Sequence, residues 1–134
     1  MEVENKIILD RDSFLLVKKG AYELPTGVAF FIPLVVISEL YFAAGRIDIS
    51  IFKINESLKG IQILELSNET ALIYSDIRKH YSRKERSGNS IYRDNLYYLA
   101  SLAIEYGYNL IVSKRNYNAL KSYHHDDLVL VKVE

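Results

Sequence analysis

The sequence contains no cysteine and no tryptophan, and it has only one methionine and two prolines. Without cysteine the chain has no disulfide bond, no zinc–thiolate site and no thiol nucleophile. The longest apolar stretch, residues 28–37, is too short to cross a bilayer and is interrupted by Pro33. The first residues carry acids and precede no apolar signal region, so we expect a cytoplasmic protein without a membrane partner.

The net charge is zero, so the overall charge gives no reason to expect nucleic-acid binding. Any surface that binds nucleic acid must therefore be local. With 134 residues, of which 49% are hydrophobic and 25% charged, the chain has the size and composition of one globular domain spanning residues 1–134.

Apolar runs that favour buried strands alternate with stretches that have helical spacing. We expect strands near residues 7–10, 29–37, 61–66, 110–113 and 128–133. We expect helices near residues 12–18, 39–44, 49–58, 69–85, 95–106 and 116–122. Asp12 or Ser13 is a candidate cap for the first helix, and Ser38 for the second. This alternation predicts an α/β fold with a parallel sheet and helices on both faces.

Acidic residues fall where the buried segments begin or end. Asp10 closes the first apolar run, Glu39 follows the longest one, and Asp94 opens the helix expected near residue 95. Two like charges about 4 Å apart repel by on the order of 4 kcal/mol at an effective dielectric near 20. Such a cluster persists only when a cation or bound protons offset the repulsion, so these three acids predict a divalent-metal site.

A purely structural interpretation of the same acids is also open. Asp10 and Asp12 are well placed to cap the first helix, and Glu39 would be favoured by the helix dipole if it lay in a first turn. Each acid alone is explained better in this way, whereas the three together favour the metal site.

Three runs of the sequence resemble the PIN domain family, and in size and layout its VapC type: ILDRDSFLLVKKG, LPTGVAFFIPLVVISELYFAAGR and RDNLYYLASLAIEYGYNLIVSKRNYNAL. The most specific part is the Ser–Glu–Leu–Tyr–Phe junction within residues 34–42. The resemblance covers nearly the whole chain. It implies a three-layer α/β/α fold with a small central parallel sheet.

The resemblance also implies a function, that of a Mg²⁺- or Mn²⁺-dependent endoribonuclease of the VapC toxin type. Its target would be single-stranded or structured RNA, and its partners a second copy of the chain and an antitoxin protein. By position, Asp10, Glu39 and Asp94 would be the catalytic acids and metal ligands, and Asp12 an additional ligand. Oxygen ligands of this kind suit both cations.

The chain departs from the family pattern at several of these positions. Arg11 and Asp12 stand where the family usually has small polar residues. Arg115 takes the place of the fourth acid, and Asn116 and Asn118 are the nearest neutral ligands. At the third acid position, Asn95 aligns almost as well as Asp94.

A basic segment precedes Asp94, and a positively charged stripe leading to an acidic pocket would hold the phosphates of RNA. The proposed RNA-binding residues are Arg78, Lys79, Arg83, Lys84, Arg86 and Arg93. The alternative is an ordinary solvated helix face. The pair of histidines and pair of aspartates at residues 124–127 is interpreted as a polar turn.

Two other functions remain open. The Asp10–Arg11–Asp12 sequence after an apolar strand is similar to the nucleophile motif of haloacid-dehalogenase-like phosphatases, although the chain is short for that fold and Glu39 would have no role. The other alternative is a catalytically degenerate PIN-like module that binds RNA or protein, in which Arg11 or Arg115 replaces the cation.

Overall fold

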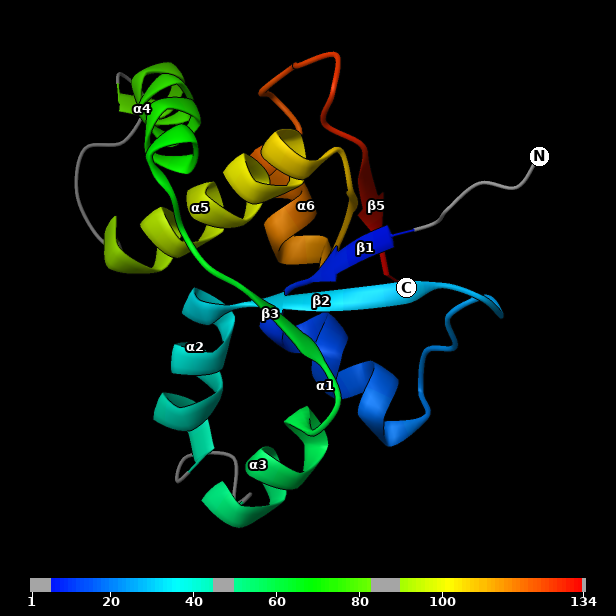
Figure 1. The fold of residues 1–134 in the computed structure, drawn as a ribbon. Helices are drawn as coiled ribbons and strands as arrows, with labels where there is room; N and C mark the ends of the chain where they lie inside the picture. Colours follow the sequence, from blue (N-terminus) through cyan, green and yellow to red (C-terminus); the bar gives the residue numbers. More distant parts are fainter. Residues whose placement is uncertain (1–5, 45–49, 83–89, 134) are drawn as a thin grey trace.

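A computed structural model describes residues 6–44, 50–82 and 90–133; for residues 90–92 only the backbone is described. Figure 1 shows a central sheet with helices above and below it. The strands are β1 (Lys6–Leu9), β2 (Ala29–Pro33), β3 (Gln62–Leu64), β4 (Asn109–Val112) and β5 (Leu130–Lys132). The helices are α1 (Arg11–Lys19), α2 (Leu34–Ala44), α3 (Ile51–Leu58), α4 (Asn68–Ser82), α5 (Ser90–Tyr106) and α6 (Lys114–Leu120).

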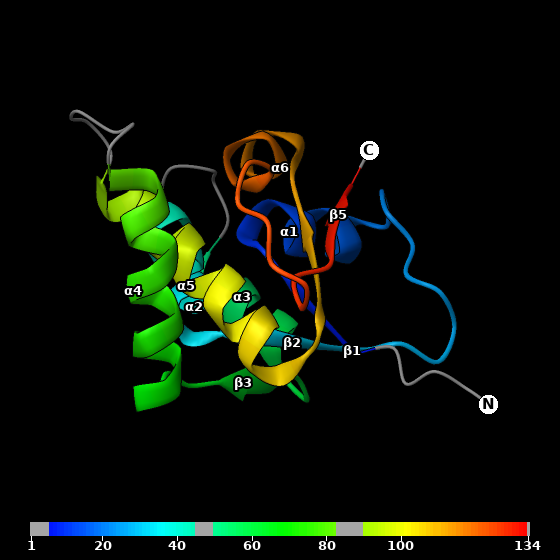
Figure 2. The same cartoon turned by 90° about the horizontal axis from the view of Figure 1, so that it is seen from above.

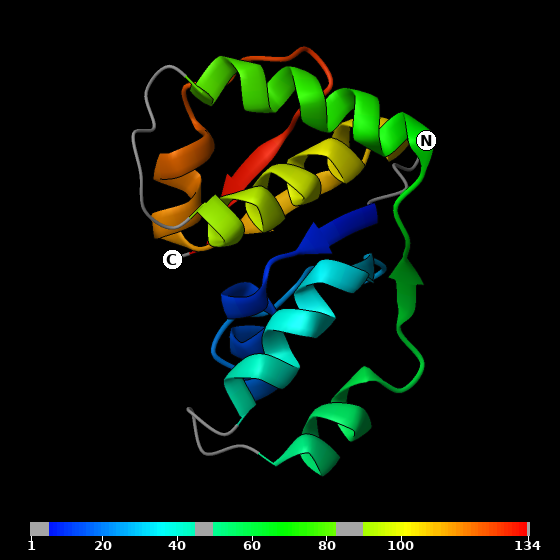
Figure 3. The ribbon, with the colours of Figure 1, turned by 90° about the vertical axis from the view of Figure 1, so that its left-hand side faces the viewer.

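The five strands lie in the order β3-β2-β1-β4-β5, and every neighbouring pair is parallel. The chain adds strands from β1 to β3 toward one edge of the sheet, and then β4 and β5 toward the other edge. Because parallel crossovers are right-handed, the connecting helices of these two halves lie on opposite faces. Helices α1 to α3 accordingly lie on one face and α4 to α6 on the other (Figure 3). The predicted three-layer α/β/α fold with a small parallel sheet is confirmed.

The core fills the space between the sheet and both helical layers. Residues on the central strands, such as Ile8, Leu9 and Leu110, are fully buried, as is Leu102 on α5. Strands covered on both faces are apolar without alternation, which is the pattern that β1 and β4 show in the sequence.

Helices α4 and α5 form an antiparallel pair, and Figure 2 shows them side by side over the sheet. Tyr74 stacks on Tyr98 with ring centroids 4.1 Å apart, and Tyr81 stacks on Tyr97 at 5.0 Å. At the other end of the pair, buried Thr70 donates a hydrogen bond to the Glu105 carboxylate. The tyrosines here are packing residues between the two helices.

The second strand is shorter than predicted, because Pro33 ends β2 and α2 begins at Leu34. Proline donates no hydrogen bond to a strand ladder, which ends the pairing there. Ser38 is therefore not a helix cap; it lies inside α2 and donates to the Leu34 carbonyl oxygen. Glu39 lies beyond the first turn of α2, so the interpretation based on the helix dipole is wrong for this residue.

None of the helices within the described residues is long and apolar enough to span a membrane. The segment with Arg83, Lys84 and Arg86 lies outside the described residues.

The burial pattern predicts how two leucine substitutions will differ. Leu102→Ala removes a fully buried side chain from α5 and should lower the free energy of unfolding by about 2–5 kcal/mol. Leu72→Ala, at a position 69% exposed on α4, should change it by less than about 0.5 kcal/mol. Urea denaturation of both variants beside the wild type measures the difference, and equal losses would contradict the described core.

Candidate active site

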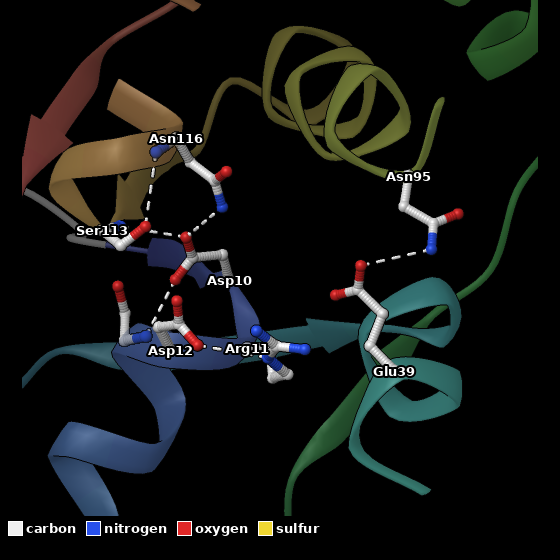
Figure 4. Close-up of polar contacts among 8 residues, drawn as sticks. Asp10, Arg11, Asp12, Glu39, Asn95, Ser113 and Asn116 are labelled. Carbon is white, nitrogen blue, oxygen red and sulfur yellow. Dashed lines mark hydrogen bonds and ion pairs between the residues drawn. The ribbon is translucent and has the colours of Figure 1, made fainter. Parts of the chain in front are cut away.

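Asp10 follows β1 directly and is only 1% exposed. Its Oδ1 accepts a hydrogen bond from the Ser13 backbone N–H at 2.8 Å, which makes it the N-cap of α1. Its Oδ2 accepts from the Ser113 backbone N–H at 2.9 Å and from the Asn116 side-chain amide at 2.7 Å. Figure 4 shows Asp10 between the starts of α1 and α6. We call these four residues the Asp10 cluster.

The cap of α1 is thus Asp10, as the purely structural interpretation expected, and not Asp12 or Ser13. These three hydrogen bonds do not use all the acceptor positions of the Asp10 carboxylate, because a carboxylate has about four lone-pair positions. One acceptor position, on Oδ1, remains for a further ligand.

The Asp10 cluster occupies a special place in the sheet. Strands β1 and β4 are neighbours, yet the helices that follow them, α1 and α6, lie on opposite faces. In open parallel sheets, ligands bind outside the carboxyl ends of the strands at such a switch in direction. Asp10, after β1, and Ser113, after β4, both stand at this edge.

Glu39 approaches the same edge from α2 (Figure 4). Burial raises the pKa of Glu39 above its ordinary value of 4.5, and the nearby charges of Asp10 and Asp12 act in the same direction. A hydrogen bond from the Asn95 amide, 3.3 Å long, and the charge of Arg11 lower this pKa. The structure therefore places two of the predicted acids, Asp10 and Glu39, at the same edge of the sheet, where the charge of Asp10 acts on Glu39.

Asp94 is oriented differently from Asn95. Consecutive residues point roughly 100° apart around a helix axis, and Asn95 is the residue that reaches Glu39. The Asp94 carboxylate accepts a hydrogen bond from the Tyr74 hydroxyl at 2.8 Å and pairs with Arg78. Burial, followed by this hydrogen bond, raises the pKa of Tyr74 to about 12, so its hydroxyl stays a donor at neutral pH. Of the two candidates for the third site position, the geometry favours Asn95.

Arg11 and Asp12 lie at the start of α1 and form an ion pair, with Arg11 Nε 3.1 Å from Asp12 Oδ1. The Asp12 side chain is 42% exposed, so it lies at the rim of the site rather than inside it. Arg115 is exposed on α6, whereas the neighbouring Asn116 is buried against Asp10. The amide of Asn116, and not the Arg115 guanidinium, thus occupies the place beside Asp10.

Among the proposed RNA-binding residues, the described ones lie near the meeting of α4 and α5. Lys79 and Arg93 are exposed, and Arg78 is half-buried in its pair with Asp94. Residues 124–127 lie in the connection before β5, and the His125 ring accepts a hydrogen bond from the Asp127 backbone N–H at 3.0 Å. This agrees with the predicted polar turn.

The donor set suits a hard divalent cation held by few protein ligands. Across residues 6–44, 50–82 and 90–133, no group of three or more acidic, histidine or cysteine side chains is arranged to hold a metal ion. Mg²⁺, however, usually keeps several waters and binds one or two carboxylates plus substrate phosphates. Asp10 and Glu39 are two such carboxylates. The buried Ser13 hydroxyl next to Asp10 has no hydrogen-bond partner in the structure and is a further polar group available to a hydrated ion.

Sequence reasoning overlooked the role of Ser113. Its hydroxyl accepts a hydrogen bond from the Asn116 backbone N–H at 3.3 Å and caps α6, while its own N–H binds Asp10. The serine directly after the apolar run 110–112, with an amide three residues later, was the available signal, since this spacing is typical of a helix start.

The fold and the site together define an α/β domain with carboxylates at the carboxyl edge of a parallel sheet. The PIN domain family profile matches residues 7–118. The chain belongs to the PIN domain family. This membership excludes the haloacid-dehalogenase-like alternative. None of the curated protein sequences matches the chain.

Solved structures with the same fold come from toxin–antitoxin complexes. A chain of VapBC-5 from Mycobacterium tuberculosis, described as a member of the VapBC family of toxin-antitoxin systems, superposes with a TM-score of 0.65 at 19% identity, covering 96% of this chain and 98% of that one. A chain of VapBC2 from Rickettsia felis, bound to a DNA fragment from its promoter, gives a TM-score of 0.67 at 16% identity, covering 96% and 99%. DNA-bound VapBC from Salmonella typhimurium gives 0.64 at 17%, covering 96% and 98%.

The raised pKa of Glu39 leads to a prediction about pH. The folded protein holds this proton more tightly than the unfolded chain, so Glu39 costs stability as pH rises from about 4.5 through its folded pKa. Glu39→Gln should therefore raise the melting temperature at neutral pH in metal-free buffer, and the gain should disappear below pH 4.5. Thermal melts of both proteins in EDTA across this range measure the effect. A gain that does not depend on pH would contradict it.

Proposed function

We propose that the protein is a metal-dependent endoribonuclease of the VapC toxin type, which cleaves single-stranded or structured RNA in the cytoplasm. Its membership of the PIN domain family and the fold it shares with chains of VapBC complexes support this proposal. The observation that carries it is that Asp10 and Glu39, two carboxylates from different elements, both stand at the switch-point edge of the sheet (Figure 4).

The placement of these acids is difficult to explain by stability alone. Glu39 is held where burial and like charges both oppose its ionisation, and its hydrogen bond from Asn95 is long, at 3.3 Å. Groups with a pKa perturbed by burial and by a specific charged neighbour, located at a ligand-binding edge, mark candidate functional sites. A cation between Asp10 and Glu39 would offset both costs.

In the proposed mechanism each residue has a separate role. Asp10 and Glu39 would hold a Mg²⁺ or Mn²⁺ ion, while Ser113 and Asn116 fix the Asp10 carboxylate and Asn95 orients Glu39. When bound, such an ion lowers the pKa of a coordinated water and stabilises charge on the scissile phosphate. Asp94 supports the site indirectly, by joining the start of α5 to α4 through Tyr74 and Arg78.

RNA binding is proposed for the basic surface next to the site. Lys79 near the end of α4 and Arg93 in the first part of α5 are exposed, and Arg93 is close in sequence to Asn95. Charges at such positions attract the phosphate backbone without regard to base sequence. Arg83, Lys84 and Arg86, between the two helices in sequence, would add to this surface.

The second candidate function is a PIN-like module that binds RNA or protein without cleaving it. The specific observation in its favour is that an amide, Asn95, contacts Glu39 where a third carboxylate was expected. The positive charge of Arg11 also acts on Glu39. The neutral amide and the arginine both weaken the attraction of the site for a cation.

Partner proteins are proposed for an apolar surface on α2 and α3. Phe42 is 72% exposed and Phe52 is 70% exposed, with Tyr41 and Ile51 also exposed next to them in sequence. Large exposed apolar side chains on adjacent helices are typical of protein–protein interfaces. We propose that a second copy of the chain binds here, and that an antitoxin protein covers the site.

A cleavage assay tests the proposed function. Purified protein should cleave a mixed-sequence single-stranded RNA in Mn²⁺ or Mg²⁺ and lose this activity in EDTA. Glu39→Gln should lower the rate by at least about 100-fold, because it removes one of the two charged ligands. Glu65→Gln, the same chemical change at an exposed position after β3, should leave the rate unchanged.

Three results of this assay would contradict the proposed nuclease activity. Cleavage that persists equally in Glu39→Gln would identify a contaminant. An absence of cleavage combined with a melting temperature that does not respond to Mn²⁺ would favour the binding module, since an ion that binds only the folded state raises stability. Cleavage that persists in EDTA would exclude the metal-dependent mechanism.

The proposed interface gives a separate prediction. Phe42→Ser should shift the chain from dimer to monomer, because it removes the most exposed large apolar side chain of the surface on α2 and α3. Leu72→Ser, at a similarly exposed leucine on α4, should leave the dimer intact. Light scattering coupled to size exclusion measures the mass, and a monomeric wild type would contradict the interface.

A further inference from the structure

Arg11 is the first residue of α1 and directly follows the buried Asp10. Its Nε lies 3.1 Å from Asp12 Oδ1, its side chain is 29% exposed, and its charge acts on Glu39. Figure 4 shows the guanidinium on the side of Asp12 that faces Glu39. A fixed positive charge therefore lies at the rim of the site, paired with Asp12 and acting on Glu39.

The charge of the site limits how many cations it attracts. Asp10, Asp12 and Glu39 supply three negative charges and Arg11 one positive charge, which leaves two negative charges. The remaining polar residues, Asn95 and Asn116, are neutral amides. One divalent cation neutralises this set, whereas a second would leave an excess of positive charge in a partly buried site.

The hydrogen bonds of Asp10 lead independently to the same limit. Three of about four lone-pair positions of its carboxylate are taken by Ser13, Ser113 and Asn116. A carboxylate that bridges two metal ions needs two free positions, one for each ion. Asp10 has only one, so it can contact one ion.

We propose that Arg11 takes the place of a second cation in this site, so that the chain binds one divalent ion and holds it less tightly than the carboxylates alone would. This inference rests on the proposed metal-dependent function. It goes further by stating how many ions bind and that Arg11 limits this number. Arg11 acts here through charge, since its guanidinium stays protonated at all ordinary pH values.

Calorimetric titration of Mn²⁺ into the metal-free chain tests this proposal without measuring activity. The wild type should bind one Mn²⁺ per chain. Arg11→Gln should bind Mn²⁺ at least about tenfold more tightly, because a charge removed from a partly buried site acts on a divalent ion with little screening. Arg11→Lys, which keeps the charge, should bind within about threefold of the wild type.

The control is Lys19→Gln, which removes the same charge from the exposed end of α1 and should change the affinity by less than about twofold. Two ions per wild-type chain, or an Arg11→Gln affinity equal to that of the wild type, would overturn the proposal. If the wild type still cleaves RNA with Mn²⁺ in that case, the proposed function stands. If neither the wild type nor Arg11→Gln binds Mn²⁺, the metal-dependent function fails together with this inference.

Discussion

The buried carboxylate of Asp10 is the interaction on which the geometry of the site depends. Its hydrogen bonds join the start of α1 to the start of α6 and thereby tie together the ends of β1 and β4, which are about a hundred residues apart in the chain. A buried charge is stable only when its partners are in place. The same bonds that satisfy Asp10 therefore fix the edge of the sheet at which Glu39 and Asn95 meet.

This arrangement makes the site more polar and less acidic than its family resemblance implies. Asn95 contacts Glu39 where a third carboxylate was expected. Next to Arg115, which takes the place of the family's fourth acid, the neutral amide of Asn116 donates a hydrogen bond to Asp10. The remaining attraction for a cation comes from Asp10 and Glu39, reduced by Arg11. These charges are the basis of the proposal that this PIN domain binds a single divalent ion.

The layered fold could be predicted from the sequence because strands buried on both faces are continuously apolar and are separated by helical stretches. The prediction was wrong between residues 34 and 37, where an apolar run is equally compatible with a buried strand and a buried helix. Only the end of strand pairing at Pro33 decides between them.

Asp10 could be placed at the carboxyl edge of the sheet from the sequence, because it follows a predicted strand that the structure contains. Glu39 was expected there for a different reason from the one observed: the strand ends at Pro33, and Glu39 approaches the edge from within α2. The third position could not be placed in this way. Asp94 and Asn95 differ by one residue, so the rotation of α5 about its axis decides which of them faces Glu39. That rotation is set by the packing of α5 against α4, through contacts such as Tyr74 with Tyr98, which a single sequence does not reveal.

A crystal of the chain soaked in Mn²⁺ would show how many ions bind and where, because the anomalous scattering of manganese locates each bound ion. The account predicts one anomalous peak, within coordination distance of the Asp10 and Glu39 carboxylates, with Arg11 beside it. A peak at Asp94, a second peak in the site, or no peak at saturating Mn²⁺ would contradict it.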